Sequence, residues 1–272
     1  FFSILIIQNM SNYTISITFG DQAENHHGMQ KIGEMRNSGL SVDQLIQLQN
    51  DLFCEMETEM VWISDLLNEE SAKVIPEELR ESQDMEACVL IIRNGVSLFL
   101  DELDLDIDDL DNEQKCLDFD KKAKMRGMVK RKWARWNLCF GDDEQEPDYE
   151  NGKGRIVSWV DVPILNFIKE ALEDNIVSPL VGELNYYYDT SKCGIGFHGD
   201  TERRIVICVR LGNSMPMDWV WYYQGERVTS KLRRILHNGD IYIMSSKAVG
   251  YDWRKRKIPT IRHAAGSDKY TK

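Results

Sequence analysis

Residues 185–200 read "NYYYDTSKCGIGFHGD" and end in His198, Gly199 and Asp200. Side chains two residues apart on an extended strand project to the same face, so the imidazole of His198 and the carboxylate of Asp200 are predicted to point together. Such a pair supplies two of the three donors of a facial iron site, which is built from two histidines and one carboxylate. The third donor has to come from another part of the chain.

The segments that follow Ser178 predict the architecture around this pair. They are short, rich in apolar residues and separated by turns, which favours a sandwich or a double-stranded β-helix over a parallel sheet. The predicted strands lie around residues 182–188, 195–198, 203–211, 217–223, 231–236, 240–245 and 258–263. Just upstream, residues 161–174 have Pro163 in the first turn and a helical apolar repeat, and they predict a helix.

The N-terminal part predicts a smaller α/β region. Residues 12–19 alternate like a strand, and residues 41–56 begin with Ser41 as a helix cap. Residues 87–100 hold two apolar runs around Asn94 and Gly95, which predicts a hairpin. The acidic run 101–114 is interpreted as a solvated linker; the glycine that a calcium loop needs at its sixth position is missing there.

Composition restricts the class of protein. The chain has 272 residues, 42% of them hydrophobic, and suits one large domain or a domain with an extension. Its six cysteines form no CxxC pair, so we interpret them as reduced thiols of an intracellular protein, cytoplasmic or nuclear. The apolar N-terminus is short and lacks a basic flank, which predicts no secretory signal and no membrane association.

The net charge of −12 hides a strong asymmetry. Residues 1–120 hold 6 Lys and Arg against 26 Asp and Glu, whereas residues 121–140 hold 8 against none. The basic segment 121–137 also contains Trp133 and Trp136, and we predict that it tracks phosphates and stacks on bases. The alternative is a solvated helix face whose two tryptophans reach the core. A second basic run covers residues 253–257. The residues predicted to contact nucleic acid are Lys130, Arg131, Lys132 and Trp133.

Three pairs in order resemble a known family: Asn185-x-Tyr187, His198-x-Asp200 and Arg256-x5-Arg262. Together they resemble the AlkB family of Fe(II)/2-oxoglutarate-dependent dioxygenases. The resemblance implies an α+β protein with a double-stranded β-helix (jelly-roll) core and flanking helices over residues 115–272. Residues 1–114 would then form an N-terminal α/β extension with an acidic linker. Residues 17–33, together with the C-terminal half, are also similar to proteins of giant DNA viruses and algae, which supplies no activity.

The resemblance also implies roles for single residues. His198 and Asp200 match iron ligands, Asn185 and Tyr187 match side chains that contact the cosubstrate 2-oxoglutarate, and the two arginines match those that bind its carboxylates. The basic segment 121–137 lies where the family has its nucleotide-contacting lid.

The third iron ligand of the family falls on Lys255, and an ammonium group has no lone pair to donate. His263 directly follows Arg262, so it should face away if Arg262 points into the barrel. His237 precedes a turn, and His26 and His27 belong to an N-terminal loop. The sequence therefore leaves the third ligand open.

Two functional hypotheses follow. The first is a dioxygenase that uses Fe(II) and 2-oxoglutarate to hydroxylate or demethylate its substrate, with a nucleobase, flipped into the pocket when it lies in a duplex, as the substrate class considered. The second is an oxygenase-fold module without catalytic iron that binds nucleic acid or a protein partner, with Lys255 in a basic patch. A third, structural interpretation makes His198 a core histidine that is hydrogen-bonded to Asp200. The sequence does not specify the oligomeric state.

Overall fold

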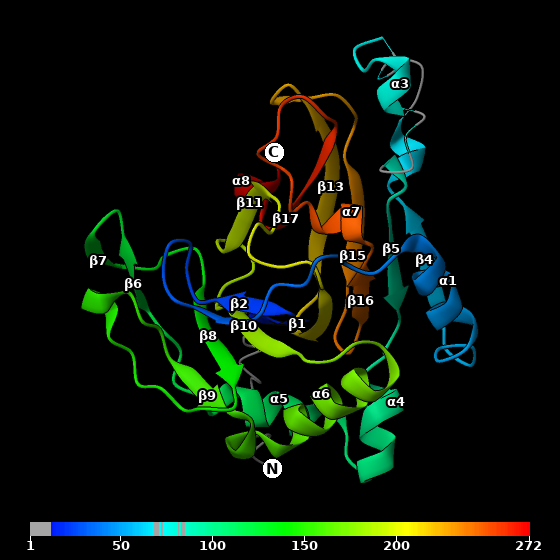
Figure 1. The fold of residues 1–272 in the computed structure, drawn as a ribbon. Coiled ribbons are helices and arrows are strands. Elements are labelled where there is room, and N and C mark those ends of the chain that lie inside the picture. Colours follow the sequence, from blue (N-terminus) through cyan, green and yellow to red (C-terminus); the bar gives the residue numbers. More distant parts are fainter. Residues whose placement is uncertain (1–11, 68–70, 72, 81, 83–84) are drawn as a thin grey trace, which may run out of the picture.

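The computed structural model describes residues 12–67, 71, 73–80, 82 and 85–272, and it has an α+β fold dominated by two curled sheets (Figure 1). No helix within these residues is long and apolar enough to span a bilayer. Neighbouring strands of the large sheet run antiparallel, except for one parallel pair at its edge. In spatial order, this sheet contains β4 (Thr58–Trp62), β5 (Cys88–Ile92), β16 (Ile241–Met244), β12 (Ile207–Gly212), β1 (Thr14–Gly20), β10 (Val181–Tyr187), β8 (Trp136–Gly141) and β9 (Ile156–Ser158).

The second sheet is smaller and is built from the C-terminal half of the chain. It contains β11 (Gly194–His198), β17 (Thr260–Gly266), β13 (Met215–Tyr223) and β14 (Glu226–Arg227), with β15 (Leu232–Leu236) paired to β13. The strands predicted after Ser178 are therefore confirmed. From β10 to β17 the chain passes back and forth between the two sheets, so residues of both sheets come together repeatedly.

An N-terminal strand lies in the middle of the large sheet. β1 pairs with β10 on one side and with β12 on the other, while β4 and β5 extend the same sheet beyond β16. Both pairings of β1 join residues that are far apart in sequence. The predicted division between residues 1–114 and 115–272 therefore does not coincide with a division between sheets.

The two faces of the large sheet differ in chemistry because side chains alternate along each strand. On β1, Ile15 and Ile17 are fully buried in the main core, whereas Ser16 and Thr18 face a cavity on the other side. Helices α1 (Val42–Asn50), α5 (Ile107–Lys115) and α6 (Pro163–Asn175) contribute to the apolar core, and Figure 1 shows α5 and α6 along one side of the molecule. The inner face is polar along β1 and β10, where it lines the cavity, whereas along β5 and β16 it packs apolar side chains against the small sheet.

Local signals explain where two of these helices begin. Ser41 Oγ accepts a hydrogen bond from the backbone N–H of Gln44, and the Gln44 side chain accepts one from the N–H of Ser41, which forms a capping box. Helix α6 has Pro163 in its first turn, where the missing N–H costs no hydrogen bond. Both predicted helices are confirmed.

Two predictions for the N-terminal part are wrong. The acidic run 101–114 contains α5, because Asp106 caps the first turn by accepting from the N–H groups of Asp108 and Asp109, and Leu110 is fully buried. The predicted hairpin at Asn94 does not form. Strand β5 already has a neighbour on each side, β4 and β16, and the second apolar run forms the short helix α4 (Ser97–Leu100).

The basic segment also differs from the helical alternative. It contains β6 (Lys122–Met125) and β7 (Met128–Arg131), which form a two-stranded ribbon. Arg126 and Gly127 join the strands with φ values of 52° and 81°, as a two-residue hairpin turn requires. Figure 1 shows this ribbon standing out from the body of the protein.

Candidate metal centre and its cavity

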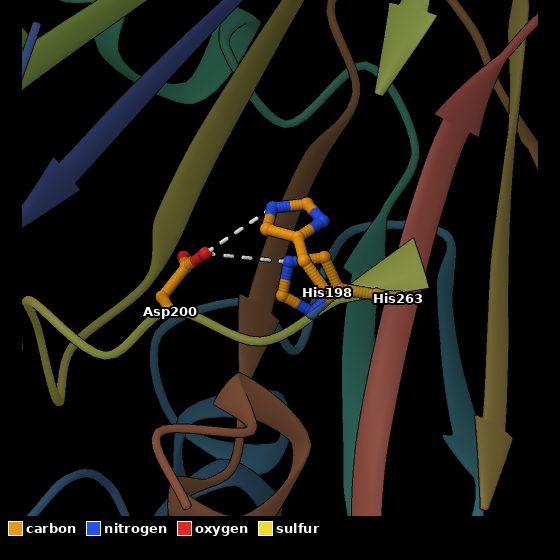
Figure 2. Close-up of side chains that lie close together, drawn as sticks. All are labelled: His198, Asp200 and His263. Carbon is orange, nitrogen blue, oxygen red and sulfur yellow. Dashed lines mark ion pairs between the residues drawn. The ribbon is translucent and has the colours of Figure 1, made fainter. Parts of the chain in front are cut away.

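Three side chains converge where β11 ends (Figure 2). Nε2 of His198 and Nε2 of His263 each lie 3.5 Å from Oδ1 of Asp200, and one donor atom of each residue lies within 4.8 Å of the other two. The imidazole rings meet edge to face, with their centroids 4.6 Å apart. Two imidazoles and one carboxylate that converge in this way are the donor set of a facial iron centre. His263 is therefore the candidate for the third donor that the sequence left open.

The ladder between β11 and β17 places both histidines. His198 is paired directly with His263 across these strands, so the two side chains leave the sheet on the same face. Arg262 points the other way, and its guanidinium lies 3.9 Å from the centroid of the Tyr222 ring. The alternation of Arg262 and His263 is as predicted, but the two faces are reversed: the histidine faces the cavity.

Gly199 allows the chain to bring Asp200 back to the imidazoles. A Cβ at this position would lie 2.0 Å from the carbonyl oxygen of Gly250, which is closer than any side chain permits. Immediately afterwards, the N–H of Asp200 donates to the carbonyl of Val249, at the end of α7 (Ser246–Val249). The residue between the two predicted ligands is therefore fixed by close backbone contact.

The other residues considered as third ligand lie elsewhere. Lys255 is exposed, its ammonium lies 5.7 Å from the Tyr251 ring centroid, and it does not line the cavity of the three donors. His237 is exposed and shares a hydrogen bond with Ser214. His26 and His27 do line this cavity, from the loop after β2 (Gln22–Glu24).

Burial and hydrogen bonding set the protonation states of His198 and Asp200. Burial lowers the pKa of His198 to about 4, and nearby His263 acts in the same direction. Nδ1 of His198 lies 2.8 Å from the carbonyl oxygen of Gly196, so Nδ1 carries the proton and Nε2 keeps its lone pair. Burial acts to raise the pKa of Asp200, but His263, Arg203 and His198 together hold it well below its usual range. The site therefore offers a neutral imidazole and an ionised carboxylate at neutral pH.

Arg203 connects the carboxylates around the centre. The residue is 3% exposed, and Nη2 donates to Glu183 and, at 3.1 Å, to Glu202. Nε of Arg203 lies 3.7 Å from Oδ2 of Asp200, the oxygen opposite to the one that faces the histidines. Arg203 therefore orients Asp200 so that Oδ1 points at the imidazoles.

A cavity of about 350 Å³ surrounds the three donors. Asn185 and Tyr187, predicted to contact a cosubstrate, line it from the inner face of β10, and Arg135 Nε donates to Asn185 Oδ1 at 2.5 Å. Arg256 and Arg262, predicted to bind carboxylates, do not line it. Arg256 donates to the backbone carbonyl of Gln224. Arg256 and Arg262 therefore lie outside the cavity that contains the candidate metal centre.

Four arginines line the cavity: Arg135, Arg203, Arg210 and Arg254. Arg135 and Arg254 belong to the two predicted basic segments, whereas the sequence analysis missed Arg203 and Arg210. The signal for Arg210 was a single charge within the apolar run "IVICVRLG" of residues 205–212, since a charge in a buried strand needs a reason. The sequence analysis considered His263 as a ligand, but the sequence does not show which face of its strand points into the cavity.

The residues predicted to contact nucleic acid do not share one environment. Lys130, Arg131 and Trp133 are exposed, Trp133 at 68%, and the Arg131 guanidinium lies 4.6 Å from the centroid of the Trp133 ring. Lys132, in contrast, is 4% exposed and donates to Oδ1 of Asn25 at 2.7 Å. Burial lowers the pKa of Lys132 to about 8. Lys132 is therefore a structural residue at the base of the ribbon, and its prediction as a contact is corrected.

The base of the ribbon is tied to the cavity mouth through Asn25, which itself lines the cavity. Nδ2 of Asn25 donates to Oδ2 of Asp120 at 2.6 Å, while its Oδ1 accepts from Lys132. In the same loop as Asn25, Nε2 of His27 lies 3.3 Å from Nη2 of Arg254, which belongs to the second basic run. Both predicted basic segments thus adjoin the mouth of one cavity.

Comparison with known proteins gives one close relative. The chain is 44% identical over 263 residues to "Uncharacterized protein R156" of Acanthamoeba polyphaga mimivirus, and the match covers 95% of this chain and 98% of that protein. No protein-family model matches the sequence. Such a match over nearly the full length of both chains implies a common fold.

Proposed function

We propose that this chain, which belongs to the same family as the mimivirus protein R156, is an Fe(II)/2-oxoglutarate-dependent dioxygenase of AlkB type. The observation that carries the proposal is the convergence of His198, Asp200 and His263 within 4.8 Å on the wall of a cavity. Nitrogen and oxygen donors in this ratio suit Fe(II), and they leave coordination positions for other ligands.

The order of the strands supports a double-stranded β-helix core. In such jelly rolls, eight strands form two facing sheets. In this protein β10, β12 and β16 belong to the large sheet, and β11, β13, β15 and β17 belong to the small sheet. The chain changes sheet at each step from β10 to β17 except between β13 and β15, which pair with each other. The gap between β10 and β12 is filled by β1. We therefore assign β1 as the eighth strand of the core, although it precedes the others in sequence.

The donor atoms of the site are available to a bound metal. Nε2 of His198 is free because Nδ1 is committed to Gly196, and Asp200 is held by Arg203 on the side away from the histidines. Fe(II) bound here with 2-oxoglutarate would supply the oxidation of a substrate C–H bond by O2. The protein would contribute by fixing the donors in place.

The substrate class in this proposal is a nucleobase, and the basic ribbon supports it. Residues 121–140 carry 8 positive and no negative charges, and the ribbon stands out from the body of the protein (Figure 1). Its base is joined by Lys132 to Asn25, which lines the cavity. A two-stranded ribbon fits the major groove of DNA, and lysine and arginine bind phosphates without regard to sequence. The exposed ring of Trp133 adds a surface on which an unpaired base can stack.

The test is an anaerobic titration with Fe(II), followed by 2-oxoglutarate, in which the visible charge-transfer band of the chelate and the iron content are measured. We expect about one equivalent of iron and a band that is lost in His198→Ala. Lys255→Ala serves as the matched control and should retain both. Absence of metal uptake in the unmodified protein would exclude the dioxygenase and favour the binding module.

A further inference from the structure

Aromatic rings and guanidinium groups alternate in a column that leads to the mouth of the cavity. Arg262 and Tyr222 leave β17 and β13 on the face opposite to His263, and the guanidinium carbon of Arg262 lies 3.9 Å from the centroid of the Tyr222 ring. The same carbon lies 5.1 Å from the centroid of the Trp253 ring, and the guanidinium carbon of Arg254 lies 5.2 Å from that centroid. Trp253 and Arg254 line the cavity. This ring–cation column therefore connects the outer face of the small sheet with the cavity.

The protein itself does not neutralise the cations of this region. Residues 254–257 are four consecutive cations, and all of them are exposed. Across the described ranges of the chain, neither these side chains nor Arg262 form an ion pair with a carboxylate. Arg256 donates to the backbone carbonyl of Gln224, and its guanidinium lies against Gly225. Cations gathered in this way attract a polyanion.

We propose that the ring–cation column and the adjacent Arg256 bind single-stranded nucleic acid, with phosphates on the cations and bases stacked on the rings. The inference rests on the proposed function, under which one base of this strand enters the cavity. Every unpaired base has a π-face that can stack on an aromatic ring, whereas the bases of a duplex are already stacked on their neighbours. An acidic peptide would meet the same cations but has no planar groups for the rings.

The basic ribbon repeats this arrangement beside the same cavity. The guanidinium carbon of Arg131 lies 4.6 Å from the centroid of the Trp133 ring, which is exposed. One loop joins the two surfaces: Asn25 is hydrogen-bonded to the base of the ribbon, and Nε2 of His27 lies 3.3 Å from Nη2 of Arg254. A single strand that contacts both surfaces would therefore pass the cavity mouth.

The first experiment measures binding of the full chain to a labelled single-stranded oligonucleotide by fluorescence anisotropy over a range of salt concentrations. The double variant Arg256→Gln and Arg262→Gln should bind about 10-fold more weakly at low salt, and its slope of log affinity against log salt should fall by about 1.4, which is about 0.7 for each lost phosphate contact. The double variant Arg36→Gln and Lys115→Gln changes two exposed cations outside the column and the ribbon. It is the matched control and should keep both values. Unchanged affinity and slope in the first variant would overturn the inference.

The second experiment identifies the class of partner. The same proteins are titrated with a duplex of the same sequence, and poly-glutamate is used as a competitor of the single strand. The Arg256→Gln and Arg262→Gln variant should lose more affinity for the single strand than for the duplex. Equal losses, or displacement of the strand by poly-glutamate as efficient as by unlabelled strand, would overturn the assignment. If the double variant does not fold in urea unfolding measurements, Arg256→Gln alone, at an exposed residue, should lower the slope by about 0.7.

Binding of Mn(II) separates this inference from the proposed function. Neither Arg256 nor Arg262 lines the cavity, so the double variant should bind Mn(II) like the unmodified protein. Failure of the unmodified protein to bind Mn(II), with the single-strand results as expected, would exclude the metal centre and leave the column standing. Intact Mn(II) binding without binding of the single strand would overturn the column and leave the metal centre.

Discussion

His198 and His263 are paired directly across β11 and β17, so one rung of the small sheet fixes both imidazole donors. The spacing of the two rings is therefore set by backbone hydrogen bonds and not by flexible loops. Only Asp200 lies beyond the end of its strand, and Arg203 holds it from the far side. A site built on paired strands keeps its donors in place before a metal arrives.

Replacement of His263 by alanine should weaken Mn(II) binding by more than about 100-fold, because one of three protein donors is lost. His263 is 5% exposed, so the urea unfolding transition has to be measured in parallel to show that the variant is folded. Lys255→Ala, which removes the residue at the position expected for the family's ligand, should leave the affinity unchanged. Equal affinities of His263→Ala and the unmodified protein would remove His263 from the site.

The sequence predicted the strands of the small sheet but not which face of β17 points inward. Alternation fixes Arg262 and His263 to opposite faces, yet an arginine and a histidine are both compatible with either face. The decision depends on Tyr222 and Trp253, whose ring centroids lie 3.9 and 5.1 Å from the guanidinium carbon of Arg262. Such packing between distant segments cannot be read from local patterns.

A methyl group at Gly199 should disturb the metal centre although no donor is lost. Because the Cβ would lie 2.0 Å from the carbonyl oxygen of Gly250, the backbone between His198 and Asp200 has to move. We expect Gly199→Ala to lower the free energy of unfolding by about 1–3 kcal/mol and to weaken Mn(II) binding. Gly196→Ala is the matched control, since its nearest neighbour atom is 3.8 Å away. Calorimetry and urea unfolding of both variants check this, and equal effects would contradict the steric explanation.

The sequence around β1 also does not predict that this strand lies in the middle of the large sheet. Residues 12–19 were predicted as a strand from their alternation, but the pairing of Ser16 with Asn185 and Arg210 joins parts of the chain that are far apart. The alternation of Ser16 and Thr18 with Ile15 and Ile17 does show that one face is polar. Which segment that face opposes is decided by the whole sheet.

Acid should destabilise the metal-free protein over a pH range to which His26 contributes together with His198. Burial lowers the pKa of His26 from 6.5 to about 4, and Lys132 and Arg135 act in the same direction. Between these pH values, the unfolded chain binds a proton that the folded chain does not, so the free energy of unfolding falls as the pH is lowered through the window. His26→Gln should show a shallower fall in urea unfolding between about pH 7 and 4. His237→Gln, at an exposed histidine, should follow the unmodified protein, and identical curves for all three proteins would contradict the assignment.

Charge reversal on the ribbon should weaken binding to duplex DNA and reduce its dependence on salt. Lys130 and Arg131 are exposed on β7, and each phosphate contact that is lost should lower the slope of log affinity against log salt by about 0.9. The double variant Lys130→Glu and Arg131→Glu is therefore expected to bind less tightly at low salt, with a slope reduced by about 1–2. Arg227→Glu changes an exposed charge on β14, away from the ribbon, and provides the control. Fluorescence anisotropy with one duplex over a range of salt concentrations measures both quantities. A double variant that matches the control in slope and affinity would exclude the ribbon as the phosphate-binding surface. It would leave the metal centre unaffected, because neither substituted residue lines the cavity.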